Sequence, residues 1–158
     1  MSRAFVREPD AETPPEPLPD ISLPPPPNPV TARGAARIEA AISDLEARLA
    51  DPAAPDAAEL RRKLRYWTAR RAIAQITPPP ADPDEVGFGS SITLSWPGRG
   101  TVTIEIVGED ESDPATGRVS WRAPIASALI GAAAGESVEA TVGARSLLLT
   151  VLAVQNAA

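Results

Sequence analysis

The sequence of 158 residues contains no cysteine and no histidine, and aromatic residues make up only 4% of it. Without cysteine the chain has no disulfide, no thiolate zinc site and no thiol nucleophile. Without histidine it has no Ser-His-Asp triad, no imidazole metal ligand and no imidazole base that titrates near neutral pH. An enzyme working alone would therefore depend on Asp, Glu, Lys, Arg, Ser, Thr or Tyr.

Long apolar runs are also missing. The longest, residues 128–134 and 146–154, are far shorter than the ~20 residues that a membrane-spanning helix needs. The residues before the first prolines include no apolar stretch like that of a secretory signal. We therefore expect a protein of the cytoplasm that does not associate with membranes.

Proline and charge are unevenly distributed along the chain. Ten of the 19 prolines lie in residues 1–29, which predicts a disordered, partly polyproline tail. A docking motif for a proline-binding module is the alternative. The net charge is −3 over residues 1–29, +3 over residues 30–77 and −6 over residues 78–158. A basic middle between acidic ends disfavours a simple nucleic-acid-binding domain, which would be basic as a whole.

Residues 31–77 have the apolar spacing of two helices. The apolar residues recur every three or four positions, as on one face of a helix: Ile38, Ile42, Leu45 and Leu49, then Leu60, Leu64 and Trp67. Thr31 can cap the first helix. The prolines of residues 51–55 break the pattern and allow the chain to reverse. We therefore expect an antiparallel helical hairpin, a coiled coil about 30 Å long.

Beyond a Pro-rich linker at residues 78–85, the apolar period changes to two. Residues 124–131 begin with Pro and end with Gly, like a short helix. Alternating residues predict strands at 90–96, 101–106, 118–122, 137–142 and 147–152. The predicted fold class is α+β, in which the N-terminal helical hairpin is followed, over residues 86–154, by an antiparallel sheet packed on one short helix.

Four segments of this second unit carry a family resemblance. They read VGFGSSITL at residues 86–94, IVGEDESDP at 106–114, VSWRAPIASALIG at 119–131 and AGESVE at 134–139. With these motifs in this order, the chain resembles the Gre transcription elongation factors (GreA/GreB). The resemblance implies an FKBP-like C-terminal domain that docks on the rim of the secondary channel of bacterial RNA polymerase. It also implies a coiled-coil arm that enters the channel, near nascent RNA and DNA.

The same resemblance implies a monomeric regulator rather than an enzyme, with no cofactor and no metal ligands of its own. In the family, the turn before the short helix meets the channel rim. The matching residues are Pro124, Ile125, Ala126 and Leu129. Arg122 belongs to the same predicted polymerase contact, although the family usually has an acidic residue or Asn there. Ser127 also departs from the family, which usually has Arg at that position.

The arm departs more strongly from the family. Residues 31–34, Thr-Ala-Arg-Gly, resemble the start of its first helix, but each helix is about two heptads shorter, a loss of ~20 Å of reach. In the family, an Asp and a Glu at the tip help to hold a second Mg²⁺ at the polymerase active centre, where backtracked RNA is cleaved. Asp56 and Glu59 keep the D-x-x-E spacing. The favoured alternative is a capping box at the start of the second helix.

Two charged stretches have more than one interpretation. On residue types alone, Glu109–Asp113 predicts a solvated acidic turn. The second helix is strongly basic, and its exposed face would either be solvated or contact RNA or polymerase. The residues proposed for that contact are Arg61, Arg62 and Arg65, and Lys63, Arg70 and Arg71 belong to the same helix.

The expected function is a polymerase-binding regulator of elongation whose stimulation of transcript cleavage is weak or absent. The alternative is a cleavage-competent Gre factor that uses Asp56 and Glu59 to hold the polymerase Mg²⁺. A peptidyl-prolyl isomerase is the remote alternative, because only the FKBP-like fold suggests it. The aromatic residues that the domain offers for such a pocket are Phe88, Trp96 and Trp121.

Overall fold

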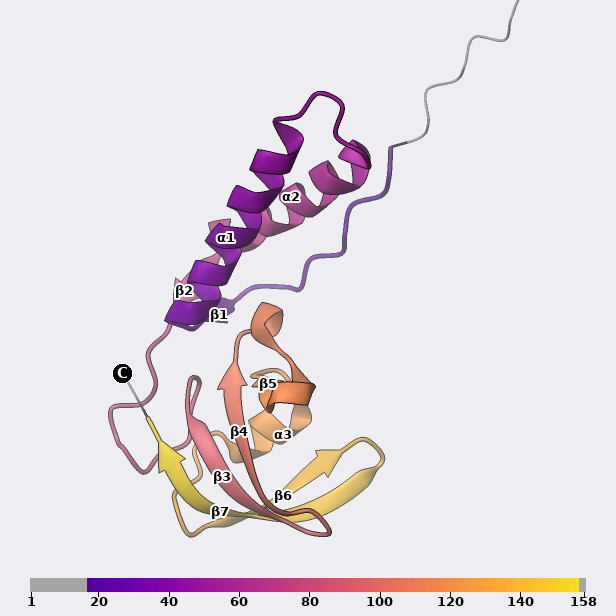
Figure 1. Cartoon of the computed structure of the whole chain (residues 1–158). Coiled ribbons are helices and arrows are strands. Elements are labelled where there is room, and N and C mark those ends of the chain that lie inside the picture. The colour runs from indigo at the N-terminus through magenta and orange to yellow at the C-terminus, as the bar shows by residue number, and fades with distance from the viewer. Residues whose placement is uncertain (1–16, 157–158) are drawn as a thin grey trace, which may run out of the picture.

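The computed structural model describes residues 17–156, so the first 16 residues of the predicted tail lie outside the described residues. A helical hairpin stands on a curled five-stranded sheet, and one short helix covers the sheet (Figure 1). The fold class is therefore α+β, as predicted. No helix within residues 17–156 is long and apolar enough to span a membrane.

The hairpin consists of α1 (Ala32–Leu49) and α2 (Ala57–Ala72). The predicted cap of α1 is confirmed, because the Thr31 hydroxyl accepts a hydrogen bond of 3.0 Å from the backbone N–H of Gly34. The apolar seam is buried where its spacing predicts it, at Ile38, Ile42, Leu45 and Leu60. With 18 and 16 residues, the two helices are about 27 and 24 Å long.

A parallel two-stranded sheet joins the two ends of the hairpin. β1 (Asn28–Val30) pairs with β2 (Ala74–Ile76), and the side chains of Asn28 and Val30 are buried. The predicted tail included Asn28 and Pro29, and this part of the prediction is wrong. A strand of three residues is too short for an alternating pattern to indicate it in the sequence.

The main sheet has the strand order β5-β4-β3-β7-β6. Its strands are β3 (Ser91–Trp96), β4 (Gly100–Val107), β5 (Arg118–Ser120), β6 (Ser137–Val142) and β7 (Arg145–Gln155). Three of the four pairings are antiparallel, as predicted, but β5 runs parallel to β4. The reason is the connection between them. Between β4 and β5, two 3-10 turns, η1 (Glu109–Glu111) and η2 (Pro114–Thr116), carry the chain back along β4. β5 therefore begins beside Glu105 and runs in the same direction as β4.

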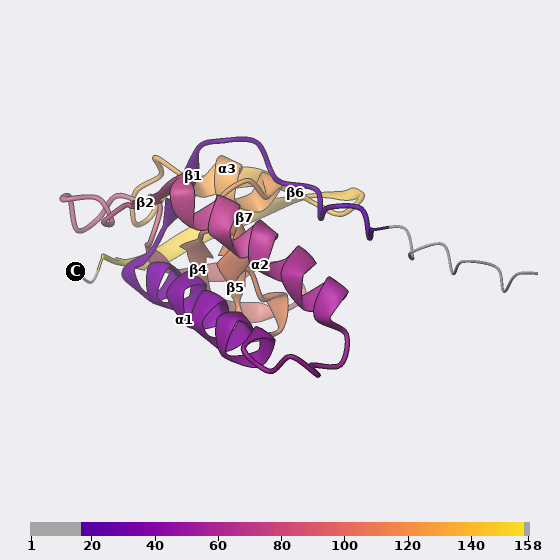
Figure 2. The same cartoon turned by 90° about the horizontal axis from the view of Figure 1, so that it is seen from above.

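The core of the sheet unit lies between the concave face of the sheet and the predicted short helix, α3 (Pro124–Leu129). Ile92, Leu94, Ile106, Leu149 and Val151 of the sheet are 5% exposed or less. They pack in one cluster with the buried residues of α3. The hairpin and the N-terminal segment lie at one end of the sheet, and the β3–β4 turn lies at the other end, as Figures 1 and 2 show.

Candidate functional site

The joint between hairpin and sheet is built around Arg70, a residue of α2 whose side chain is fully buried. Its Nε donates to Asp110 Oδ2 at 2.7 Å, and its Nη2 donates to Glu109 Oε2 at 3.1 Å. The same Nη2 donates to Asn28 Oδ1 at 2.6 Å, and Asn28 Nδ2 donates back to the Arg70 carbonyl at 3.1 Å. Arg70 therefore ties together β1, α2 and the acidic turn η1.

Tyr66, one helical turn before Arg70, donates its hydroxyl to Asp110 Oδ1 at 2.5 Å. Burial raises the pKa of Tyr66 to about 12, and the hydrogen bond to Asp110 and the charge of Asp110 act in the same direction. For Arg70, burial lowers the pKa, but the hydrogen bond and the charge of Asp110 outweigh it and raise the pKa. Asp110 therefore holds both side chains in their protonated forms.

Glu111 makes the second connection of the joint, to the start of α1. Its side chain is 4% exposed and accepts hydrogen bonds from the backbone N–H of Thr31 at 3.1 Å and of Gly108 at 3.2 Å. The Thr31 hydroxyl also donates to Glu111. A Cβ atom at Gly34 would lie 2.3 Å from the Glu111 carboxyl group. Glycine is therefore required at position 34 for the carboxylate to approach the helix.

These contacts overturn the solvated-turn interpretation of the acidic motif. The carboxylates of Glu109, Asp110 and Glu111 face the hairpin, and each has a partner there or beside it. Arg70, which the basic-helix interpretation included in the α2 charge, is likewise buried rather than exposed. Sequence reasoning missed this joint. The available signal was the coincidence of three adjacent acids with an unusually Arg-rich helix.

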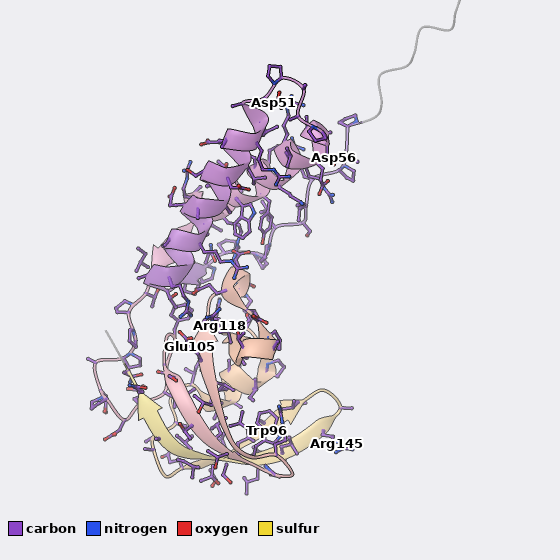
Figure 3. All side chains as sticks on the ribbon, in the orientation of Figure 1. Asp51, Asp56, Trp96, Glu105, Arg118 and Arg145 are labelled. Atoms are coloured by element: carbon purple, nitrogen blue, oxygen red, sulfur yellow. The ribbon has the colours of Figure 1, made fainter. Side chains whose placement is uncertain are left out.

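The tip of the hairpin does not have the predicted capping box. Asp56 stands before α2 with φ 57°, in the left-handed region, and its side chain makes no cap hydrogen bond. An N-cap side chain reaches the helix N–H groups from an extended backbone, so the left-handed conformation explains the loss. Glu59 instead pairs with Arg62 at 3.1 Å and Lys63 at 4.0 Å. Asp51 joins Asp56 at this end of the hairpin, away from the sheet (Figure 3).

The tip carboxylates do not fit a preformed Mg²⁺ site. A Mg²⁺ ion needs oxygen ligands at about 2.0–2.1 Å in near-octahedral geometry. Both Glu59 oxygens already face cationic side chains, which would have to move away before a metal ion could bind. The D-x-x-E spacing of the sequence is thus present, but the structure uses Glu59 within α2.

The basic face of α2 is partly occupied by internal ion pairs. Arg62 bonds Glu59, and Arg65 Nε donates to Asp20 Oδ1 of the N-terminal segment at 2.6 Å. Arg61 and Lys63 are exposed. Of the three residues predicted to contact RNA or polymerase, Arg61 and Arg65 present the larger solvent-exposed surface.

The five residues predicted to contact polymerase divide into two groups. Ile125, Ala126 and Leu129 are 9% exposed or less and belong to the core, so they fix α3 rather than offer a surface. Pro124 is exposed at the first position of α3. Arg122 is exposed but engaged within the molecule, because its Nε bonds Glu109 at 2.7 Å and its guanidinium lies 4.5 Å from the Trp121 ring centre.

The family comparisons agree with this arrangement of motifs. The profile described as "Transcription elongation factor, GreA/GreB, C-term" matches residues 80–156. Transcription elongation factor GreA of Verminephrobacter eiseniae is 32% identical over 140 residues, which cover 70% of this chain and 86% of that protein. This chain belongs to the GreA/GreB family. Transcription elongation factor GreB of Neisseria meningitidis serogroup B is 35% identical over 82 residues, 51% of this chain and 50% of that protein.

The chain thus spans about half the length of several of the GreA/GreB relatives that it matches. A solved structure, "Prokaryotic transcription elongation factor GreA/GreB from Nitrosomonas europaea", shares 22% identity and covers 82% of this chain and 99% of that one. Its TM-score of 0.42 is too low to establish a shared overall arrangement. The profile match includes the acidic turn and α3 but leaves out the hairpin, so Asp56 and Glu59 lie outside it.

The GreA/GreB-type sheet unit also has a partly open cavity of about 530 Å³ beside the turn between β3 and β4. Its apolar wall includes Trp96, Val102, Ile104 and Val142, and Arg99 lies 5.1 Å from the Trp96 ring centre. Of the three aromatic residues considered for an isomerase pocket, Phe88, Trp96 and Trp121, Trp96 lines this cavity. Figure 3 labels Trp96 near the β3–β4 turn.

Proposed function

We propose that this protein binds bacterial RNA polymerase at the rim of the secondary channel and regulates elongation, with weak or absent stimulation of transcript cleavage. Membership of the GreA/GreB family supports the choice of partner. The observation that carries the proposal is the short hairpin held by a buried joint, because it sets how far the tip carboxylates can reach.

The length of the hairpin is the first part of this argument. The alignment with the Verminephrobacter factor is 140 positions long, but it includes only 70% of the 158 residues of this chain. The remaining aligned positions are gaps in this chain, so the relative has segments that this chain lacks. If the missing length lies in the arm, the tip stops ~20 Å short of the active centre. At that separation, the Coulomb energy between unit charges in water is only ~0.2 kcal/mol. A remote carboxylate would therefore not replace a direct ligand.

The rigidity of the joint is the second part. Inward movement of the arm would have to separate Arg70 from Asp110 and Glu109, and Thr31 from Glu111. Breaking a buried ion pair by losing one partner costs about 3–5 kcal/mol. Tilting of the arm toward the polymerase metal is accordingly unfavourable.

Two other functions remain alternatives. A cleavage-competent factor would use Asp56 and Glu59 to hold the polymerase Mg²⁺, and the exposure of Asp56 at the tip favours it. A peptidyl-prolyl isomerase would use the cavity beside Trp96, and it depends on the FKBP-like character of the sheet unit, which stays a prediction. The coiled-coil description of the arm, the monomeric state, the proximity of RNA and DNA, and the cytoplasmic location also stay predictions.

The test is a cleavage assay on a backtracked elongation complex of the cognate RNA polymerase. Wild type is compared with the Asp56→Ala, Glu59→Ala double variant, and with Asp44→Ala, Glu46→Ala, which removes equal charge from exposed positions of α1. We expect no prompt release of short 3′ fragments by any of them, and competition by all three with a full-length Gre factor. Prompt cleavage by wild type that is lost only in the tip variant would establish the cleavage-competent alternative.

A further inference from the structure

The segment before β1 lies along the hairpin. Residues 17–27 form no helix or strand, yet they follow the α2 side of the hairpin in both views (Figures 1 and 2). Asp20 Oδ1 accepts from Arg65 Nε at 2.6 Å. Beside this ion pair, Ile21 of the segment and Tyr66 of α2 line a common small hollow. The segment therefore meets α2 through an ion pair and borders a hollow that it shares with α2.

The same segment also reaches the turn before α3. Arg122 Nη2 donates to the carbonyl oxygen of Pro25 at 2.7 Å and to that of Pro27 at 3.3 Å. A polyproline backbone has no N–H groups of its own to compete for these carbonyls. One continuous segment thus contacts Arg65 of the basic helix and Arg122 of the α3 turn. These are two of the residues predicted to contact polymerase or RNA.

We propose that residues 17–27 form a strap that covers the polymerase-facing side of this protein and is displaced when polymerase binds. This inference rests on the proposed function, because polymerase is the competitor. The strap lowers the affinity for polymerase by the fraction of molecules in which it is closed.

The strap is held weakly enough to be displaced. Asp20 and Arg65 have side chains that are 72% and 51% exposed, and exposed ion pairs contribute little to stability. Within residues 17–156, no backbone–backbone hydrogen bond connects residues 17–27 to a helix or strand. Such a segment opens at low free-energy cost. Its prolines, six in residues 17–27, also reduce the conformational entropy lost when it closes again.

Charge gives the strap its specificity for α2. Asp20 is the one charged residue of residues 17–27, so the strap has a net charge of −1, whereas residues 30–77, which include α2, have a net charge of +3. The Asp20 carboxylate thus occupies Arg65, a cation that would otherwise meet RNA or an acidic protein surface. Because the contact is exposed, added salt weakens it.

The first experiment reverses the charge of the strap in the full chain. Asp20→Lys replaces the partner of Arg65 with a repelling cation. The matched control is Asp44→Lys, which changes the net charge equally at a residue that is 68% exposed and pairs with Arg48 at 3.7 Å. We expect Asp20→Lys to tighten binding to the cognate core RNA polymerase about fivefold relative to Asp44→Lys. Equal affinities of the two variants would overturn the strap.

The second experiment follows the strap itself. Because the chain has no cysteine, Leu18→Cys and Ser43→Cys place two spin labels at exposed positions, one before Asp20 and one on α1. Electron spin resonance should give a narrow distance distribution in the free protein and a broad, longer one after polymerase is added. A broad distribution in the free protein, or an unchanged one in the complex, contradicts the proposal. If the distribution is narrow but the protein does not bind polymerase, the proposed function is refuted. The proposed competition between the strap and polymerase is then refuted as well.

Discussion

At the scale of single residues, Arg70 shows how a charge can be accommodated in the interior. The guanidinium is fully buried, and Asp110, Glu109 and Asn28 contact two of its three nitrogens. Burial lowers the pKa of Arg70, but the hydrogen bond and the charge of Asp110 outweigh burial and raise it. The joint therefore depends on the carboxylates of Asp110 and Glu109, because an unpaired charge in this place would be costly.

Replacement of Arg70 should destabilise the whole protein. Arg70→Met keeps an unbranched side chain of similar length but leaves the carboxylates of Asp110 and Glu109 without their cation. We expect the free energy of unfolding to fall by about 3 kcal/mol, as measured by urea titration. The control is Arg71→Met, because Arg71 pairs with Glu39 at 3.3 Å in an exposed position. That variant should change stability by less than about 0.5 kcal/mol; similar losses in both would show that Arg70 has no special role.

Tyr66 gives the joint a pH dependence above neutrality. Its pKa is raised from 10.0 to about 12 in the folded protein, so the folded state binds the phenol proton more tightly than the unfolded state. The resulting stabilisation is complete below pH 10 and is lost as the pH rises through 12. Between these values the unfolding free energy of wild type should fall more steeply than that of Tyr66→Phe.

The chain offers a direct check, because Tyr66 is its only tyrosine. Titration of the phenolate absorbance in the near ultraviolet therefore reports this group alone. A midpoint at the ordinary pKa of about 10, with parallel stability curves for wild type and Tyr66→Phe, would mean that the bond to Asp110 does not form in solution.

The residues of the joint were only half accessible to sequence reasoning. Thr31 was recognised as a cap from its type and place, and the acidic motif was recognised through the family resemblance. The partner of that motif was not, because Arg70 lies 40 residues away from Asp110 and belongs to a helix whose other arginines are at least partly exposed. Which of several arginines is buried depends on how α2 is placed against η1, and apolar spacing does not specify that.

At the scale of elements, the helices and most strands follow from local patterns. The predicted strand at residues 137–142 has the same bounds as β6, since alternation and flanking glycines both mark it. β5 was predicted two residues too long and antiparallel, because its direction depends on the turns η1 and η2 rather than on its own three residues. The start of α2 was located correctly, but its cap was wrong, because residue type alone does not reveal a left-handed backbone.

That left-handed residue leads to a prediction for the hairpin turn. Asp56 adopts φ 57°, a conformation that costs a residue with a side chain about 1 kcal/mol but costs glycine nothing. Since its side chain makes no cap bond, Asp56→Gly should raise the unfolding free energy by about 0.5–1 kcal/mol. Asp56→Ala should not gain this, because alanine keeps the steric cost. A loss of about 1 kcal/mol in both variants would instead restore the capping interpretation.

At the scale of the whole molecule, the joint connects the hairpin and the sheet unit into one rigid unit. The two anchors, Arg70 on α2 and Glu111 beneath α1, hold both legs of the hairpin to the same acidic turn. The turn in turn reaches the α3 side of the sheet through Glu109 and Arg122. A surface that docks beside α3 therefore also sets where the hairpin tip points, and this links the two parts of the proposed function.

The last prediction concerns that docking surface. Of the residues proposed to meet polymerase beside α3, Pro124 is exposed, whereas Ile125, Ala126 and Leu129 are buried in the core. Pro124→Asn should therefore weaken binding to the cognate RNA polymerase about tenfold, the loss of one buried contact, and leave the circular dichroism spectrum unchanged.

Pro114→Asn is the matched control, because Pro114 is also an exposed proline at the first position of a short helical turn. Since Pro114 lies at η2 and is not among the residues proposed to meet polymerase, its replacement should leave the affinity for polymerase as it is. Equal affinities of wild type, Pro124→Asn and Pro114→Asn, with all three folded, would place the polymerase contact elsewhere on the molecule.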